Sequence, residues 1–402
     1  MKLALNQDFF LSIVVIFFMF LFHKHIFVHP AMCWIMIVAF FVSSFSWNIH
    51  IIHKKILLIS ALFICLSVYF FLRIEPITIT ALAVGASAWV IPNDQSIAIG
   101  TILAGLVFFI GNAYGRSHQK LFKTGRYVAL FYVTSLVIKM FKDFIAQESI
   151  HDLWIGKIVL IFAPLASLIF YQNSRYKRCG DALLLITVIA LLFSSSRVSA
   201  LCILVFLGIF HIRNNFRWTK TTHSLFFIIF FAILSAFIYV YGRLEHLSWA
   251  QDLDKLSWKY FNKSFFSGRN FIWPELLEII SRNPLWGQGS FQESYYYAST
   301  ALPWRNLSSH NTFLEILVRG GLVGLAIFTS ILYAIWMCLY DKSHSLYARF
   351  GIAYFMAIII NVFSAEYLIT QNLTTNLIIW FCWGACVGNN LRSEVSTQQA
   401  QI

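Results

Sequence analysis

Long apolar runs recur at short intervals from one end of the chain to the other. They are continuous rather than alternating, which predicts membrane-spanning helices and argues against the strands of a barrel. One further run, at 77–91, is short and rich in Ala, Thr, Gly and Ser, so it could be a span, a re-entrant segment or an interfacial helix. Bounding each run by charged, Pro, Asn and Gly clusters gives twelve candidate spans, at 8–22, 31–46, 55–72, 96–114, 126–145, 156–172, 181–196, 198–212, 223–242, 312–340, 346–364 and 371–390. We predict an all-α polytopic integral membrane protein.

The charges of the connections assign the sides of the membrane. Four connections, at 116–126, 173–178, 213–220 and 341–349, carry twelve Lys and Arg against a single acid, which marks them as cytoplasmic. The alternate connections, including the one at Arg197 and the one around Glu366, then face outward. With the amino terminus inside, parity argues that 77–91 does not cross fully. The outer side is most simply a bacterial periplasm, and the membrane the inner membrane.

Composition adds to this picture without changing it. The chain is 59% hydrophobic and 12% charged, and its net charge of +13 follows largely from the basic inner connections. We therefore expect anionic membrane lipid rather than nucleic acid as the partner of this charge. The predicted organisation is nine helices with short loops in 1–242, a large periplasmic loop subdomain in 243–309, three helices in 310–390 and a cytoplasmic tail in 391–402.

The large loop contains its own structural signals. Its seven Lys and Arg, six Asp and Glu and many aromatic residues favour a folded subdomain with short helices. The segment 267–284 predicts a helix capped by Ser267 and stopped by Pro284, with apolar residues at helical spacing. Pro274 either kinks this helix or marks its first turn. Gly287 and Gly289 predict a tight turn.

Three features converge on the outer face by topology. Arg197 sits in a short turn between two spans, Arg269 opens the loop helix, and His310 with Asn311 opens the span that follows the loop. Guanidinium groups match phosphate oxygens and stay charged, so two of them could bind a diphosphate on a lipid carrier. His310 could accept a proton from an attacking hydroxyl. The alternatives are arginines that extend to lipid headgroups and a histidine that caps the next helix, a cap that Ser308 or Ser309 could supply instead.

Other polar residues carry weaker signals. Asp252 and Asp254 have a D-x-D spacing, but they lie outside any acid-rich cluster, and we expect no metal and no cofactor. Glu275 and Glu278 share one helix and do not predict a glycosidase pair. Trp304 and neighbouring aromatic residues could stack on sugar rings or form an interfacial belt. His211 lies in a short connection with no partner set, and we assign it no role.

The order of these motifs resembles the O-antigen ligase and polymerase superfamily. The resemblance rests on "SSR" after an apolar span, a long outer loop containing "GR", a tryptophan four residues on, "NPLWGQG", and then "HNTFLEILVRGGLVG". It covers roughly residues 190–330. One departure is Arg319, which stands before the diglycine where many members have an acid or a neutral residue. Arg319 either alters acceptor binding or extends to the headgroups.

This resemblance implies an O-antigen ligase that acts as a metal-independent inverting glycosyltransferase on the periplasmic face. The donor would be O-antigen polysaccharide on undecaprenyl diphosphate, and the acceptor a sugar hydroxyl of the lipid A core. Arg197 and Arg269 match the residues that hold the diphosphate, and His310 matches the residue that activates the acceptor. Glu315 matches a glutamate that could orient the imidazole, with Asn311, Arg319 and Trp304 in supporting places.

Two other functions compete with this prediction. An O-antigen polymerase would use the same donor but a second carrier-linked chain as acceptor, and polymerases tend to have two sizeable outer loops where this chain has one. A transporter of lipid-linked sugars would use the arginines to line a path, but the inner halves of the predicted spans hold almost no charged residues.

Overall fold

The computed structural model describes the chain in segments. These are residues 54–72, 101–102, 104–109, 111–112, 115, 130, 133–134, 137–138, 153–171, 174–193, 197–215, 218–241, 243–244, 247–261, 264–266, 269–288, 311–340, 345–363 and 373–399. The predictions for 8–22, 31–46 and 77–91 lie outside these segments.

Helices make up nearly all of the described residues, and none of those residues forms a strand. The helices are α3 (Lys54–Leu72), α6 (Leu153–Tyr171), α7 (Lys177–Phe193), α8 (Arg197–Asn215), α9 (Lys220–Tyr241), α10 (Ser248–Phe261), α11 (Arg269–Arg282), α13 (Thr312–Leu339), α14 (Leu346–Val362) and α15 (Leu373–Gln399), with a short 3-10 turn, η2, at Ser174–Tyr176. Eight of the predicted spans correspond to helices in this set, and the described residues of the spans at 96–114 and 126–145 are helical as well.

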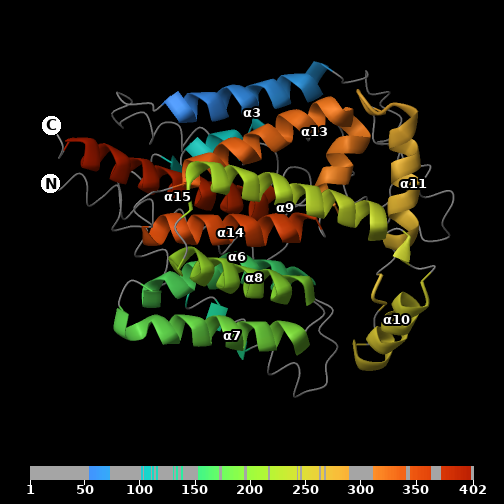
Figure 1. Ribbon diagram of the computed structural model, residues 1–402, viewed down its shortest axis with the longest axis horizontal. Helices are drawn as coiled ribbons and strands as arrows, with labels where there is room; N and C mark the ends of the chain where they lie inside the picture. Colours follow the sequence, from blue (N-terminus) through green and yellow to red (C-terminus); the bar gives the residue numbers. More distant parts are fainter. Residues whose placement is uncertain are drawn as a thin grey trace, which may run out of the picture.

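Two directions of helix define the architecture. Helices α3, α6 to α9, α14, α15 and most of α13 run side by side as a bundle, whereas α10 and α11 lie across one end of it (Figure 1). Within the bundle α8 packs against α6, α7 and α14, and α13 packs against α3. The loop subdomain therefore covers a single end of the bundle.

The apolar helices indicate a membrane protein. By length and composition α9 and α13 are suited to cross a membrane, and shorter apolar helical stretches lie in α3, α6, α14 and α15. On α9 large apolar side chains such as Ile229, Ile233 and Phe237 are exposed. In a membrane-spanning helix such side chains contact lipid rather than water.

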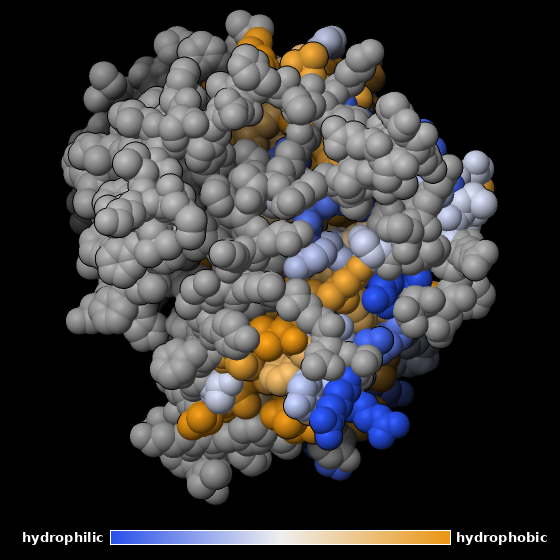
Figure 2. Space-filling model, turned by 90° about the vertical axis from the view of Figure 1, so that its left-hand side faces the viewer, coloured by the Kyte–Doolittle hydropathy of each residue, from blue (hydrophilic) through white to orange (hydrophobic). Residues whose placement is uncertain are grey.

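The described connections lie at both ends of the bundle. Helix α8 begins and α9 ends at the end covered by the loop helices, whereas α8 ends and α9 begins at the other end. At that far end, the described surface shows hydrophilic residues beside hydrophobic ones (Figure 2).

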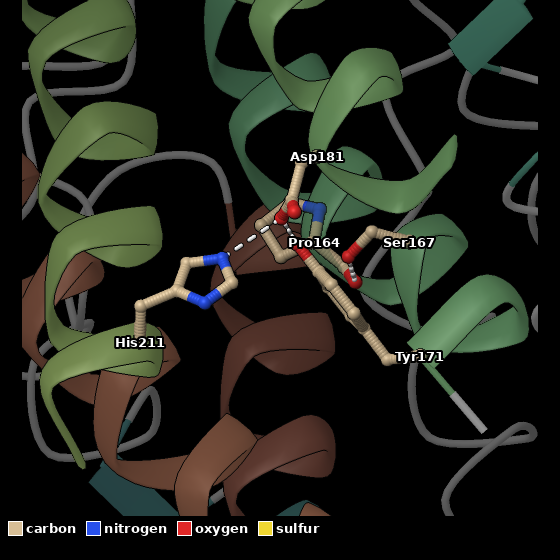
Figure 3. A network of polar contacts seen from close by, with 5 residues as sticks. All are labelled: Pro164, Ser167, Tyr171, Asp181 and His211. Atoms are coloured by element: carbon tan, nitrogen blue, oxygen red, sulfur yellow. Dashed lines mark hydrogen bonds and ion pairs between the residues drawn. The ribbon is translucent and has the colours of Figure 1, made fainter. Parts of the chain in front are cut away.

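A polar network at the far end ties three helices together. The Tyr171 hydroxyl donates to Oδ1 of Asp181 at 2.5 Å, and Nε2 of His211 lies 2.9 Å from the same oxygen (Figure 3). Within α6, Ser167 donates to the carbonyl of Pro164. The expectation that His211 has no partner was wrong, because the sequence places Asp181 thirty residues away on another helix.

Two small-residue motifs bring helical backbones into direct contact. Gly111 and Gly115 face α15, and Gly384 and Gly388 of α15 face residues 108 and 112. A Cβ at Gly111 would lie 2.2 Å from the carbonyl oxygen of Phe381, so only glycine fits there. Such spacing is typical of helix pairs in membranes, where close backbone packing replaces the hydrophobic effect as the driving force.

Helix α13 breaks at the diglycine, although the sequence predicted one continuous span. Gly321 has φ 58° and ψ −161°, a conformation that glycine adopts without steric cost. The part after the break, Leu322–Leu339, is about 27 Å long at 1.5 Å per residue, close to the thickness of the hydrocarbon core. The preceding turns are therefore not needed to cross the membrane.

The turn after α11 fills this break, and we call the contact the glycine junction. The amides of Leu322 and Val323 donate to the carbonyls of Pro284 and Leu285 at 2.8 and 3.2 Å, and the amide of Gln288 donates to Val318 at 2.7 Å. The backbone groups that lose their hydrogen bonds within α13 at the break thus form hydrogen bonds with the loop instead. These buried groups therefore stay paired.

Both chain segments that meet in the glycine junction need a glycine. Gly287 has φ 74°, which confirms the predicted tight turn, and a Cβ on it would lie 2.5 Å from the amide nitrogen of Gly321. Tyr69 of α3 donates to the carbonyl of Gly320 at 2.7 Å. Gly320 and Gly324 both lie against the ring of Tyr69, so α3 approaches α13 closely there.

We expect Gly321→Ala to destabilise the protein, because the new methyl would meet the carbonyl oxygen of Leu285 at 2.4 Å in a backbone conformation that alanine rarely adopts. The expected loss is about 1–3 kcal/mol or more, measured as a lower thermal midpoint of the purified protein in detergent. Gly208→Ala on α8 is the matched control, since a Cβ there meets nothing within 4 Å. Equal midpoints for the two variants would contradict the proposed importance of the junction.

Candidate active site

Arg197 is the first residue of α8, and its side chain is hydrogen-bonded to the loop subdomain. Its Nη1 donates to Oγ of Ser257 on α10 at 2.7 Å, and its Nη2 lies 3.3 Å from the carbonyl oxygen of Ser264. The side chain is half-buried. The guanidinium is therefore held at the end of the bundle by specific hydrogen bonds, rather than extending freely to headgroups as the alternative supposed.

The three residues Ser264–Phe266, which we call the hub, collect contacts from four elements. Asp254 of α10 accepts from the hydroxyl of Ser264 at 2.7 Å and from the amide of Phe265 at 2.6 Å. The amide of Arg269 donates to the carbonyl of Phe266 at 3.1 Å. The hub thus fixes the start of α11 relative to α10 and α8.

Tyr241, the last residue of α9, connects the two arginines. Its hydroxyl lies 3.2 Å from the carbonyl oxygens of Phe265 and Phe266, to which it donates. The same side chain is hydrogen-bonded by the guanidinium of Arg269 and lies within the electrostatic reach of Arg197. Arg197 and Arg269, 72 positions apart in the sequence, therefore act on one tyrosine.

Sequence reasoning found the arginines but missed the residues that position them. Tyr241 and Ser257 carried no chemical motif, Asp254 had only the weak D-x-D spacing, and Tyr241 was predicted as the end of a span. Trp273, four residues after Arg269, is buried and packs 5.0 Å from the Tyr241 ring, centroid to centroid. Arg269 and Trp273 thus both contact the same tyrosine.

Helix α11 presents Arg269 at its amino terminus, as predicted. The helix runs from Arg269 to Arg282, two residues inside the predicted range at each end, and Ile272, Leu276, Ile279 and Ile280 are buried. Pro274 lies within the helix rather than in its first turn, so the helix lacks one backbone N–H there. The start of α11 adds the positive end of its dipole to the guanidinium charge of Arg269.

Asn311 caps α13 through its own side chain. Its Oδ1 accepts from the amides of Phe313 and Leu314 at 2.9 and 3.1 Å, and the residue is fully buried. The N-cap is therefore Asn311, and not His310, Ser308 or Ser309, which were the alternatives that the sequence left open. An asparagine in extended conformation one position before the helix already pairs two of its first amides.

Glu315 and Arg319 form a buried ion pair one helical turn apart. Nε of Arg319 donates to Oε1 of Glu315 at 2.6 Å, and their side chains are 0% and 7% exposed respectively. Arg319 therefore does not extend to the headgroups, because it stays inside beside the glycine junction. His310 and Trp304 lie outside the described residues, so the predicted contact between Glu315 and His310 stays a prediction.

The acidic residues of the loop are engaged by protein groups. Asp252 accepts from Lys255 at 2.9 Å, whereas Asp254 holds the hub, so the two carboxylates of the D-x-D spacing serve different partners. Over the described segments, no group of three or more His, Cys, Asp or Glu could hold a metal ion. Glu278 pairs with Arg282 at 3.1 Å on the exposed side of α11.

One family model matches part of the chain. Residues 182–329 match the family model described as O-antigen ligase. This region of the chain is therefore similar to O-antigen ligases. The match includes α8, α9, α10 and α11 together with the glycine junction, so it covers every element that holds the two arginines. A search of curated proteins found no match.

The matched region contains the hub, to which both arginines are hydrogen-bonded: Arg197 through its side chain and Arg269 through its backbone amide. A lipid-linked anion would meet such a pair of charges at the membrane surface.

Breaking the buried pair should cost far more than breaking an exposed pair of the same spacing. We expect Glu315→Gln to lower stability by about 3–5 kcal/mol, because it removes the carboxylate from a buried guanidinium. Glu278→Gln, which breaks the exposed pair with Arg282, is the matched control and should change little. Thermal midpoints of the purified variants measure both, and a double Glu315→Leu, Arg319→Met variant should recover part of the loss.

Glu275 of α11 should make stability depend on pH in an unusual direction. Burial, together with repulsion from Glu278, raises the pKa of the Glu275 carboxyl above its ordinary value of 4.5. The ionised form therefore disfavours the folded state above the raised pKa, and this cost vanishes below the ordinary value.

We accordingly expect Glu275→Gln to raise the thermal midpoint at pH 7.5 and to leave it unchanged near pH 4. Asp252→Asn, on the exposed side of α10, serves as a control for removing one negative charge. A stabilisation by Glu275→Gln that is equal at both pH values would rule out the carboxyl's titration as its cause.

Proposed function

We propose that this protein is an O-antigen ligase. It transfers O-antigen polysaccharide from undecaprenyl diphosphate to the lipid A core oligosaccharide at the periplasmic face of the bacterial inner membrane, as a step of lipopolysaccharide biosynthesis. The observation that carries the proposal is that Arg197 and Arg269 are both hydrogen-bonded to the hub, inside the region that matches the ligase family. The orientation follows from the basic connections at the opposite end of the bundle.

The two arginines bind the diphosphate of the donor. Both are half-buried, so their charges are partly shielded from water yet open to a ligand. Both arginines are held at the hub, so their positive charges would act together on an anion bound there. The amino terminus of α11, the positive end of the helix dipole, adds to this attraction. Tyr241 and the hub fix the directions of the two guanidinium groups, which lowers the reorganisation needed when charge develops on the leaving group.

His310 is the general base. The residue stands immediately before Asn311, and since Asn311 caps α13, the imidazole is not required for that structural task. A neutral imidazole takes the proton from the acceptor hydroxyl as its oxygen attacks the anomeric carbon of the donor sugar. The bond from that carbon to the diphosphate breaks, the electron pair leaves with the diphosphate, and the configuration at the carbon inverts.

Other residues support this chemistry without a metal or cofactor. The Glu315–Arg319 pair lies in the first turns of α13, which follows His310 in the sequence, and gives the helix a buried polar anchor. Trp304 offers a ring on which an acceptor sugar stacks. Neutralisation of the leaving diphosphate comes from the guanidinium groups rather than from a bound cation.

A ligase is favoured over a polymerase by the loops of the chain. One long outer loop, 243–309, supplies α10, the hub and α11, whereas the turn before Arg197 is short. A transporter of lipid-linked sugars is disfavoured because the two arginines lie at the end of the bundle and are held there by the loop.

Complementation of a ligase-deficient bacterium tests the proposal. Wild type should restore the O-antigen ladder on surface lipopolysaccharide, whereas Arg197→Ala, Arg269→Ala and His310→Ala should leave bare core while carrier-linked polymer accumulates. In a reconstituted assay each variant should lose about 10²-fold or more in rate. Arg282→Ala at the other end of α11 is the control, and membrane abundance is measured in parallel.

Three outcomes would change the assignment. If wild type fails in a matched host but the polymer shortens when the variants are expressed in its native host, the protein is a polymerase. If His310→Ala retains full activity at normal abundance, the general base is another residue. If Arg282→Ala is as inactive as Arg269→Ala, the effect of Arg269 comes from the fold of α11 rather than from the diphosphate.

A further inference from the structure

Helix α10 carries three parallel stripes of side chains. Residues at intervals of four and three positions share a face of a helix, and here each such set has its own character. The first stripe, Trp249, Leu253 and Leu256, is apolar; the second, Ala250, Asp254 and Ser257, is small or polar; the third is Ser248, Asp252, Lys255 and Lys259. The helix therefore has three distinct sides.

The second stripe faces the protein. Ala250 and Ser257 are buried, Ser257 accepts from Arg197, and Asp254 holds the hub. The third stripe is exposed and hydrophilic, with an ion pair between Lys255 and Asp252 on its surface. These two sides account for the attachment of α10 to the site and for its contact with water.

The apolar stripe has no cover among the described residues. Trp249, Leu253 and Leu256 are 52%, 40% and 48% exposed, although burying apolar side chains is favourable. Trp258 is also exposed, but it lies beyond the protein-facing stripe and is not part of this side. The described part of the chain therefore offers no cover for the apolar stripe.

Three positional facts point to the bilayer as the cover of the apolar stripe. Helix α10 lies across the end of the bundle, so its axis runs roughly parallel to a membrane that the bundle crosses (Figure 1). It begins seven residues after α9, whose last turns expose Phe237 and Val240 to lipid. Arg243 lies between α9 and α10, and its guanidinium is 4.2 Å from the Tyr239 ring centroid. Arginine and tyrosine side chains are both suited to the headgroup layer.

We propose that α10 is an interfacial helix that inserts Trp249, Leu253 and Leu256 into the acyl-chain boundary of the adjacent leaflet. The stripe with Lys255 faces water, and the stripe with Ser257 faces the arginine site. Such three-sided placement is the behaviour of amphipathic helices that lie in a membrane surface. Because Ser257 and Arg197 are in contact, the helix sets the arginine site at the height of lipid headgroups.

This placement deepens the proposed function, on which its mechanistic consequence rests. A diphosphate attached to a prenyl chain also lies at headgroup height, so the donor would reach Arg197 by moving laterally in the leaflet. A binding site raised into the periplasm would instead require the apolar chain to leave the membrane, at about 0.8 kcal/mol for each exposed methylene.

Spin-label accessibility tests the insertion without any substrate. Single cysteines at Leu253 and Leu256, and at Ser248 and Lys255 as matched water-facing controls, are labelled in a full-length background without native cysteines. The variants are reconstituted into vesicles of phosphatidylethanolamine and phosphatidylglycerol. Collision with oxygen, which concentrates in acyl chains, is compared with collision with a water-soluble nickel chelate.

We expect the logarithm of the oxygen-to-nickel accessibility ratio to be above zero at Leu253 and Leu256 and below zero at Ser248 and Lys255. High nickel accessibility at all four positions would overturn the proposal, because the stripe would then face water. Low accessibility to both reagents at Leu253 and Leu256 would also overturn it, because a protein partner or a second copy would then cover the stripe. If a labelled leucine variant fails to fold, Trp249→Cys reports on the same stripe.

The measurement is independent of catalysis. If wild type fails to restore the O-antigen ladder while the ratios at the leucines are positive, the proposed function is rejected and the interfacial helix is kept. Negative ratios at the leucines with a ladder restored by wild type would do the reverse.

Discussion

The glycine junction is the constraint on which the rest of this structure depends. A transmembrane helix that breaks must find new partners for its backbone groups, because lipid offers none. Here the amides of Leu322 and Val323 and the carbonyl of Val318 find them in the turn after α11. The break and the turn therefore require each other. Each also requires a glycine, because the two backbones approach too closely for a Cβ on Gly287 or Gly321.

The junction and the hub hold α11 at its two ends. The helix starts at Arg269, which bonds to the hub, and after Arg282 the chain enters the junction, about 21 Å away at 1.5 Å per residue. Helix α11 thus connects the arginine site to the break in α13. The two ends of α11 are held by distant stretches of the chain, so the arginine site and the broken helix keep a fixed relation.

The sequence predicted what depends on local composition. The apolar runs of α3, α9 and α14, the separation of basic connections from the outer loop and the place of Arg269 at a helix start all follow from hydropathy, charge and capping signals. What it could not predict depends on distant backbone partners. Tyr241 meets carbonyls of the hub, and His211 meets Asp181 on another helix. The break in α13 had a local signal in two adjacent glycines, but its partner lies 34 positions earlier. The stripes of α10 were readable at four- and three-residue intervals, and only the exposure of Trp249 gave them meaning.

The placement of charge explains why the site lies at the end of the bundle. A buried guanidinium costs several kcal/mol unless it is paired, as Arg319 is with Glu315. Arg197 and Arg269 avoid that cost by standing at the first residues of α8 and α11, where hydroxyl and carbonyl groups of the loop hold them. The loop thus does two things at once: it satisfies the arginines, and through α10 it joins their site to the membrane surface. A reaction between two lipid-anchored substrates is confined to that surface, so the residues that act on it must be held there by a structure that spans the boundary between hydrocarbon and water.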